Sequence, residues 1–179
     1  MPYFTNKDIT AISIGAALWA ILNILISPIF FQMTRLPCLC DLLAFVSLIL
    51  VTWLTRKFGA ASLTGIIATL LTLILRPAAF HMLGFVVASV VFDILTRAIS
   101  YKICFNRNPF VGSSIVVTFS IFCAGIAGAI VGIFFMNFDV LTGILMWAGL
   151  HAFGGLLGGL IGVIIVRALV LRKIHPLYN

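Results

Sequence analysis

The sequence has very little charge for its length. Only 8% of its 179 residues are charged, glutamate is missing altogether, and four acids stand against eleven lysines and arginines. Hydrophobic residues make up 63% of the chain, and its mean hydropathy is +1.28. Soluble domains carry roughly 25% charged residues, so this composition cannot cover a surface that faces water. It excludes a soluble enzyme, a DNA-binding domain and a secreted disulfide scaffold, and it predicts a chain embedded in a lipid bilayer without a nucleic-acid partner.

Several motifs that carry chemistry are also missing. The sequence has no Gly-x-x-x-x-Gly-Lys-Ser/Thr loop, so we do not expect the chain itself to bind ATP in that manner. It has no His-Glu-x-x-His motif or dense His/Cys cluster of the kind that holds zinc. Cys38 and Cys40 are separated by one residue, which would strain a disulfide between them. We therefore expect no metal and no cofactor.

Six apolar stretches are long enough, or nearly long enough, to cross a bilayer, for which a helix needs about 20 residues. Their apolar residues run continuously and do not alternate, which favours helices over transmembrane strands. The second and third stretches are short, so tilting or shielding by neighbours is expected there. We predict an all-α integral membrane protein, a single bundle of six transmembrane helices. The predicted helices are 11–33, 41–55, 59–75, 79–99, 111–136 and 142–170.

The basic residues divide unequally between the two sides of this predicted bundle. Arg35 and Arg76 fall on one side, and the other nine fall on the opposite side. Lysine and arginine mark cytoplasmic loops, so both termini are predicted to be cytoplasmic in a multi-pass protein of the cell membrane. The nine are Lys7, Arg56, Lys57, Arg97, Lys102, Arg107, Arg167, Arg172 and Lys173.

Polar residues of the predicted helices gather toward the outer side. Polar groups are costly inside a bilayer and tend to mark function, so this asymmetry predicts a small pocket that opens outward. Near the inner side, Asp93 is expected to pair with Arg97, four residues further along the helix. The candidate binding residues are Asn23, Gln32, Arg35, Asp41, Arg76, His81, Asn137, Asp139, Trp147 and His151.

Each candidate also has a structural interpretation that the sequence leaves open. Arg35, Arg76 and Asp139 could simply reach interfacial water, and Asn23 could tie two helices together. Trp147 could belong to the aromatic belt of the membrane interface. His151 lies deeper, about two turns into its helix, where a structural hydrogen bond is the alternative to a ligand contact. The set as a whole favours a pocket more strongly than any single member.

Small residues recur at four-residue spacing in three predicted helices, which allows membrane helices to approach closely. In helices 111–136 and 142–170 the spacing favours packing within the bundle. In helix 11–33 a partner subunit is an equally good occupant. The small residues are Ala16 and Ala20 in the first helix, Ala124, Gly128 and Gly132 in the fifth, and Gly154, Gly158 and Gly162 in the sixth.

A six-helix chain with cytoplasmic ends and an Ala-x-x-x-Ala stripe in its first helix resembles the substrate-binding (S) components of energy-coupling factor transporters. The run 56–61 (Arg-Lys-Phe-Gly-Ala-Ala), followed by 66–68 (Ile-Ile-Ala), is similar to the turn between the second and third helices in the branch linked to hydroxymethylpyrimidine and thiamine uptake. The resemblance implies that Ala16 and Ala20 dock on a transmembrane coupling subunit. It also implies that two cytoplasmic ATPases drive import.

The resemblance further implies a vitamin-capture subunit that performs no chemistry, with the outer loop 34–40 acting as a lid. An aromatic pyrimidine would be held by stacking and cation–π contacts, with hydrogen bonds from asparagine, histidine or aspartate. The family's individual ligand residues have no position-by-position match in this chain.

Two other functions stay open on the sequence. The chain could be an accessory structural subunit of a larger membrane complex. Alternatively, the run 151–154 (His-Ala-Phe-Gly) resembles the last catalytic helix of rhomboid proteases, which would need Ser113 or Ser114 within reach of His151. These serines lack the Gly-x-Ser-Gly form and fall at the opposite side of the predicted bundle, which disfavours the protease.

Overall fold

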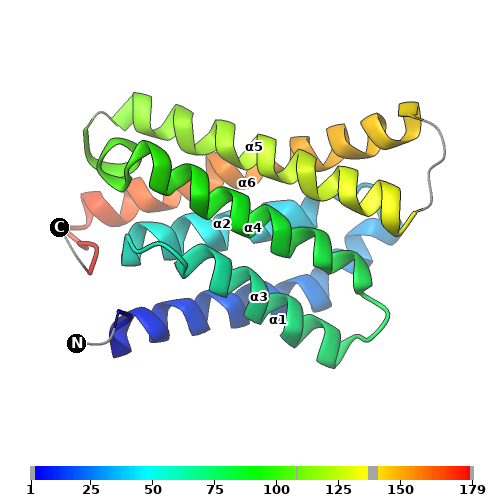
Figure 1. Ribbon diagram of the computed structural model, residues 1–179, viewed down its shortest axis with the longest axis horizontal. Helices are drawn as coiled ribbons and strands as arrows, with labels where there is room; N and C mark the ends of the chain where they lie inside the picture. The colour runs from blue at the N-terminus through cyan, green and yellow to red at the C-terminus, as the bar shows by residue number, and fades with distance from the viewer. Residues whose placement is uncertain (1–2, 108, 137–140, 178–179) are drawn as a thin grey trace.

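The computed structural model describes residues 3–107, 109–136 and 141–177, and these residues form an all-α bundle (Figure 1). A single 3₁₀ turn, η1 (Phe80–Met82), precedes the fourth α-helix, and a π-helical turn, η2 (Ile103–Arg107), precedes the fifth. The α-helices of the described residues are α1 (Asn6–Thr34), α2 (Cys38–Thr55), α3 (Ala60–Leu75), α4 (Leu83–Ile99), α5 (Pro109–Phe134) and α6 (Leu141–Leu171).

Each predicted helix has its counterpart, and the largest difference is at the start of α1. This helix begins at Asn6 and not at residue 11. The Thr5 backbone N–H and hydroxyl both donate to Oδ2 of Asp8, at 2.8 and 2.9 Å. The same oxygen lies 2.7 Å from Nζ of Lys57. Polar residues that read as a loop therefore form a capping box, which satisfies donors at the helix N-terminus.

Five helices in the described part of the chain are long and apolar enough to cross a membrane, counting Phe80–Ile99 as one unit with α1, α2, α5 and α6. The chain therefore has the architecture of a multi-pass helical membrane protein. Helix α3 has 16 residues, or about 24 Å of helix against a hydrocarbon core of about 30 Å. It nevertheless runs between the same two ends of the bundle as its neighbours (Figure 1).

The helices form a closed ring of packed neighbours in the order α1, α2, α6, α5, α4, α3 and back to α1. Helix α2 also contacts α3 and is the most buried of the candidate spans. Aromatic rings fill the middle: Trp19 packs edge-on against Phe85, and Phe45 against Phe92, each pair with ring centroids 5.9 Å apart. Such edge-to-face pairs are favoured by the quadrupoles of the rings.

The two ends of the bundle differ in what they carry (Figure 1). Both chain termini lie at one end, with the turn at 56–59 and the η2 segment; we call this the termini end. The connections at 35–37 and 76–79 lie at the opposite end, which we call the pocket end.

Glycines let α6 pack closely on two neighbours at once. A Cβ on Gly154 would lie 2.6 Å from the carbonyl oxygen of Cys38, and one on Gly158 would lie 2.8 Å from that of Leu42, both on α2. Gly159, on the adjoining ridge, faces Ser120 of α5 at 3.1 Å. The prediction that the α6 glycines pack within the bundle is confirmed.

The prediction that Ala16 and Ala20 form a docking surface is wrong, because both side chains are buried inside the chain, at 0% and 1% exposure. They point into the bundle beside Trp19, where α1 packs on α2 and α3. The approach is close enough for the Ser47 hydroxyl of α2 to donate to the Gly15 carbonyl at 2.7 Å. Small residues permit close packing with any helix, and here the neighbour belongs to the same chain.

Asp93 does not pair with Arg97, which is exposed. Instead, Oδ2 of Asp93 accepts hydrogen bonds from the Gly59 N–H at 2.9 Å, the Ser62 N–H at 3.0 Å and the Ser62 hydroxyl at 2.9 Å. Gly59 is the N-cap of α3 and has no side chain of its own to supply the cap. The carboxylate from α4 fills that role, because a helix N-terminus offers unpaired N–H donors and a positive dipole end.

Candidate functional site

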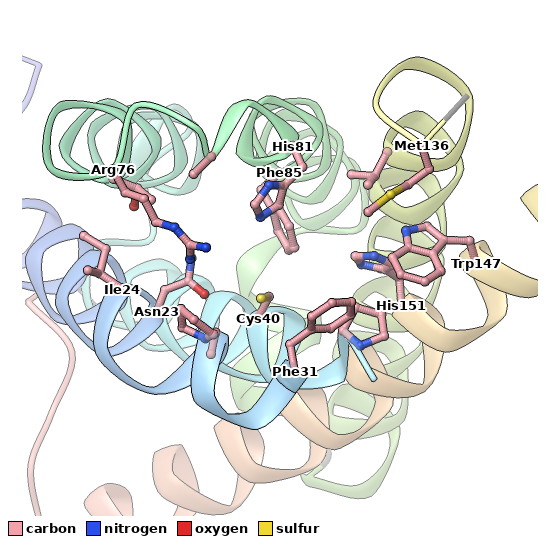
Figure 2. Close-up of a pocket in the computed structure, with 16 residues that line it drawn as sticks. Asn23, Ile24, Phe31, Cys40, Arg76, His81, Phe85, Met136, Trp147 and His151 are labelled. Atoms are coloured by element: carbon pink, nitrogen blue, oxygen red, sulfur yellow. The ribbon is translucent and has the colours of Figure 1, made fainter. Parts of the chain in front are cut away.

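A cavity of about 180 Å³ lies at the pocket end of the bundle (Figure 2). Helix α1 forms one wall, and the ends of α3 and η1 form a second. Helix α6 and the last turns of α5 close it on a third side. Of the residues predicted to form the site, the cavity is lined by Asn23, Arg76, His81, Trp147 and His151.

His151 is held from behind by Asp41. Its Nδ1 lies 3.0 Å from Oδ1 and 2.9 Å from Oδ2 of the carboxylate, and both side chains are buried. An ionised Asp41 carboxylate accepts a hydrogen bond from the Nδ1–H of the ring, and in the neutral imidazole this leaves Nε2 as a hydrogen-bond acceptor. Gly154 makes the pair possible, because the absence of its Cβ lets α6 approach Asp41 and Cys38 on α2.

Buried polar atoms of this site without a hydrogen-bond partner in the described chain include Nε2 of His151, Oδ1 of Asn23 and the Ser27 hydroxyl. The amide nitrogen of Asn23 donates to Sδ of Met82 at 3.2 Å, which orients the amide oxygen. One turn further along α1, Pro28 has no N–H, so the Ile24 carbonyl lacks its usual helical donor. Both Ile24 and Pro28 line the cavity. The cavity wall therefore offers acceptors at Asn23 and His151 beside the donors of the Ser27 hydroxyl and the Arg76 guanidinium.

Aromatic rings surround these acceptors. The Trp147 ring lies 5.7 Å from the His151 ring and 6.5 Å from Phe31, measured between centroids. Phe85 lies 6.0 Å from His151 on its other side. Figure 2 shows Arg76 reaching in toward Asn23 while His81 lies beside Phe85. Flat aromatic walls with a few polar groups are typical of small-molecule sites.

Gln32 and Arg35, which the sequence predicted for the site, do not line this cavity. Each side chain is exposed. Gln32 is nine residues after Asn23, which at about 100° per residue places it on the opposite face of α1. Arg35 is the left-handed cap of α1, with φ of 59°, and its N–H donates to the Phe31 carbonyl at 2.8 Å. Asn137 and Asp139, also predicted, lie outside the described residues.

Several residues that line the cavity were not predicted from the sequence, among them Phe31, Cys40 and Thr72. Phe31 could have been found, because Asn23, Ser27 and Phe31 follow one another at i+4 intervals on one helix face. Cys40 carries no local signal for a ligand contact. It lies on α2, and the cavity reaches it only because α1 and α2 pack closely, which no local pattern reveals.

The serine–histidine pair of the protease alternative is not formed. His151 packs against Gly128 of α5, fifteen residues after Ser113, which is about 22 Å along the helix. At the termini end, Nη2 of Arg167 donates to the Ser113 hydroxyl at 2.7 Å. The Ser114 hydroxyl donates to the Phe110 carbonyl at 3.0 Å.

Within the described residues, no three His, Cys, Asp or Glu side chains come together to hold a metal ion. All four cysteines are free thiols. Burial raises the pKa of the Cys104 thiol to about 11, so it stays protonated near neutral pH. No protein-family model, curated protein or solved structure matches this chain.

Proposed function

We propose that the chain is the substrate-binding component of an energy-coupling-factor-type importer, which captures a small vitamin-like molecule in the cavity at the pocket end. The observation that carries this proposal is the pair of buried atoms Asn23 Oδ1 and His151 Nε2, which belong to residues that line the cavity and have no hydrogen-bond partner in the described chain. Buried polar groups are almost always hydrogen-bonded. A ligand with N–H or O–H donors would satisfy both.

In this proposal the chain crosses the cell membrane six times. Helix α2 ends at the termini end and α4 begins at the pocket end (Figure 1), so α3 must bring the chain across despite its length. The uneven distribution of basic residues supports a cytoplasmic position for the termini end. The cavity then opens outward, toward the substrate supply.

The cavity supports a small, planar ligand. Its volume of about 180 Å³ is below the roughly 300–1,000 Å³ of pockets for drug-sized molecules. One heteroaromatic ring, such as a hydroxymethylpyrimidine, fits this better than the two rings of thiamine. An exocyclic amine can donate to Asn23 and His151, while the ring packs against the edge-to-face pair of Trp147 and Phe31. Arg76 lies near enough to bind a hydroxyl or anionic substituent.

The partners of this proposal are a transmembrane coupling subunit and two cytoplasmic ATPases. They follow from the family resemblance, and from the absence of a nucleotide-binding loop in the chain itself. Because Ala16 and Ala20 are buried, docking would use another surface of the bundle. Tryptophan substitution at these alanines would report packing of the core and not docking.

Equilibrium dialysis of the detergent-purified chain against 4-amino-5-hydroxymethyl-2-methylpyrimidine tests the site. His151→Ala and Trp147→Ala should each weaken binding by about tenfold or more, the equivalent of one buried hydrogen bond or stacking contact. Arg35→Ala is the matched control, since Arg35 is exposed and does not line the cavity. Equal affinity in all three variants would remove Trp147 and His151 from the binding site.

Mass spectrometry of small molecules that survive purification, together with analysis of co-purifying proteins, tests the wider proposal. We expect a retained heteroaromatic compound and a complex with the coupling subunit and ATPases. If the chain co-purifies with an assembly that has no ATPase and retains no small molecule, the accessory structural subunit is the better account.

A further inference from the structure

Arg167 lies at the meeting point of two apolar grooves on the outside of the bundle, at the termini end. One groove, of about 430 Å³, extends from Arg167 toward Leu160 on α6 and Val117 on α5. The other, of about 320 Å³, extends toward Phe105 and Leu171. Leu160 is seven residues before Arg167, about 10 Å closer to the middle of the bundle. Arg167 therefore lies at one end of an apolar groove that runs along α5 and α6 toward the middle of the bundle.

Contacts with α5 hold the guanidinium of Arg167 at this position. Its Nη2 donates to the Ser113 hydroxyl at 2.7 Å, and its Cζ lies 5.4 Å from the centroid of the Phe110 ring. Other hydroxyls on this face of α5 bond back to their own helix: Ser114 to the Phe110 carbonyl and Thr118 to the Ser114 carbonyl. The ionic group in this groove is therefore the guanidinium, oriented beside an otherwise apolar surface.

The charges around this site favour an anionic occupant. Lys102, Arg172 and Lys173 are exposed at the same end of the bundle. The acids described at this end, Asp8 and Asp93, are fully buried in their own contacts. No described carboxylate on this end is exposed to compete for Arg167.

We propose that Arg167 binds the phosphate of one anionic phospholipid, whose acyl chain lies in the groove between α5 and α6 that leads to Leu160. A guanidinium presents N–H donors in a planar fork that matches phosphate oxygens. Basic pockets between transmembrane helices are sites of this kind. The site is independent of the substrate cavity, which lies at the opposite end of the chain.

The test is native mass spectrometry of the detergent-purified chain after incubation with an equimolar mixture of phosphatidylglycerol and phosphatidylcholine with identical acyl chains. The wild-type chain should retain phosphatidylglycerol in preference by about tenfold, because the choline ammonium of phosphatidylcholine neutralises the phosphate that Arg167 would bind. Arg167→Gln should abolish the preference. Lys173→Gln removes the same charge outside both grooves and should keep it.

A second variant tests the groove without changing the charge. Val163 lines both grooves, so Val163→Trp should fill them and lower the retention of both lipids. If Arg167→Gln fails to fold, as judged by far-ultraviolet circular dichroism, Val163→Trp still tests whether lipid lies in the groove. The proposal is overturned if the wild-type chain shows no preference, if Lys173→Gln loses it as fully as Arg167→Gln, or if Val163→Trp retains lipid unchanged.

Discussion

At the scale of single residues, the three buried acids of the described chain each have a specific partner. Asp41 binds His151, Asp8 binds Lys57, and Asp93 binds the start of α3. A buried polar group without a hydrogen-bond partner is costly in an apolar environment. His151 and Asn23 are informative for the opposite reason, since one atom of each stays unpaired beside a cavity.

The cap that Asp93 supplies to α3 predicts a clear difference between two substitutions. Asp93→Ala removes the acceptor for three donors and should lower the free energy of unfolding by about 2–3 kcal/mol. Arg97→Ala changes an exposed residue and should cost less than about 0.5 kcal/mol. Unfolding of each variant in detergent, followed by circular dichroism, measures both. If both variants lose the same free energy of unfolding, the result would favour the Asp93–Arg97 ion pair that the sequence predicted.

At the scale of helices, glycine positions decide which elements can touch. α6 packs against α2 through Gly154 and Gly158 and against α5 through Gly159. With both faces in contact, α6 brings His151 beside Asp41 on one neighbour and beside Gly128 on the other. The close packing of α6 therefore positions the site as well as stabilising the fold.

Two glycine-to-alanine substitutions in α6 should have opposite effects. A Cβ on Gly158 meets the Leu42 backbone, at 2.8 Å from the oxygen and 2.9 Å from Cα, so Gly158→Ala should destabilise by about 1–3 kcal/mol. Gly149 has no heavy atom within 4 Å of its Cβ position. Gly149→Ala should be neutral or stabilise by up to about 1 kcal/mol through helix propensity. Thermal unfolding in detergent compares them, and a destabilised Gly149→Ala would contradict the packing described.

At the scale of the whole molecule, the ring of six helices separates two ends with different chemistry. The pocket end carries the cavity and the connections at 35–37 and 76–79, and the termini end carries both chain ends and most of the basic residues. The proposed capture of substrate belongs to the pocket end, where the cavity lies.

The proposed orientation can be checked with two introduced cysteines. In a chain whose four native cysteines are replaced by alanine, Ala78→Cys lies in an exposed connection at the pocket end and Lys173→Cys lies at the termini end. A membrane-impermeant maleimide should label only Ala78→Cys in intact cells, and should label both variants once the cells are permeabilised. Labelling of Lys173→Cys alone in intact cells would show that the termini end faces outward, contrary to the proposed orientation.

The sequence by itself determined the elements of this protein. Apolar runs and the polar breaks between them are local properties, so the predicted helices match the observed ones to within a few residues, apart from the capped start of α1. Five of the predicted site residues also line the cavity, because polar side chains are rare enough in this chain to be informative one by one.

Only the tertiary structure decided which face of each helix meets which neighbour. A small-residue stripe allows close packing with any helix, so Ala16 and Ala20 could not be assigned to a partner or to the core before α2 and α3 were in place. Likewise, Asp93 accepts a hydrogen bond from Ser62 at the N-terminus of α3, and the two residues are 31 positions apart in the sequence. Asp41 contacts His151 at a separation of 110 residues. The paired groups come within hydrogen-bond distance only when the helices that carry them pack side by side.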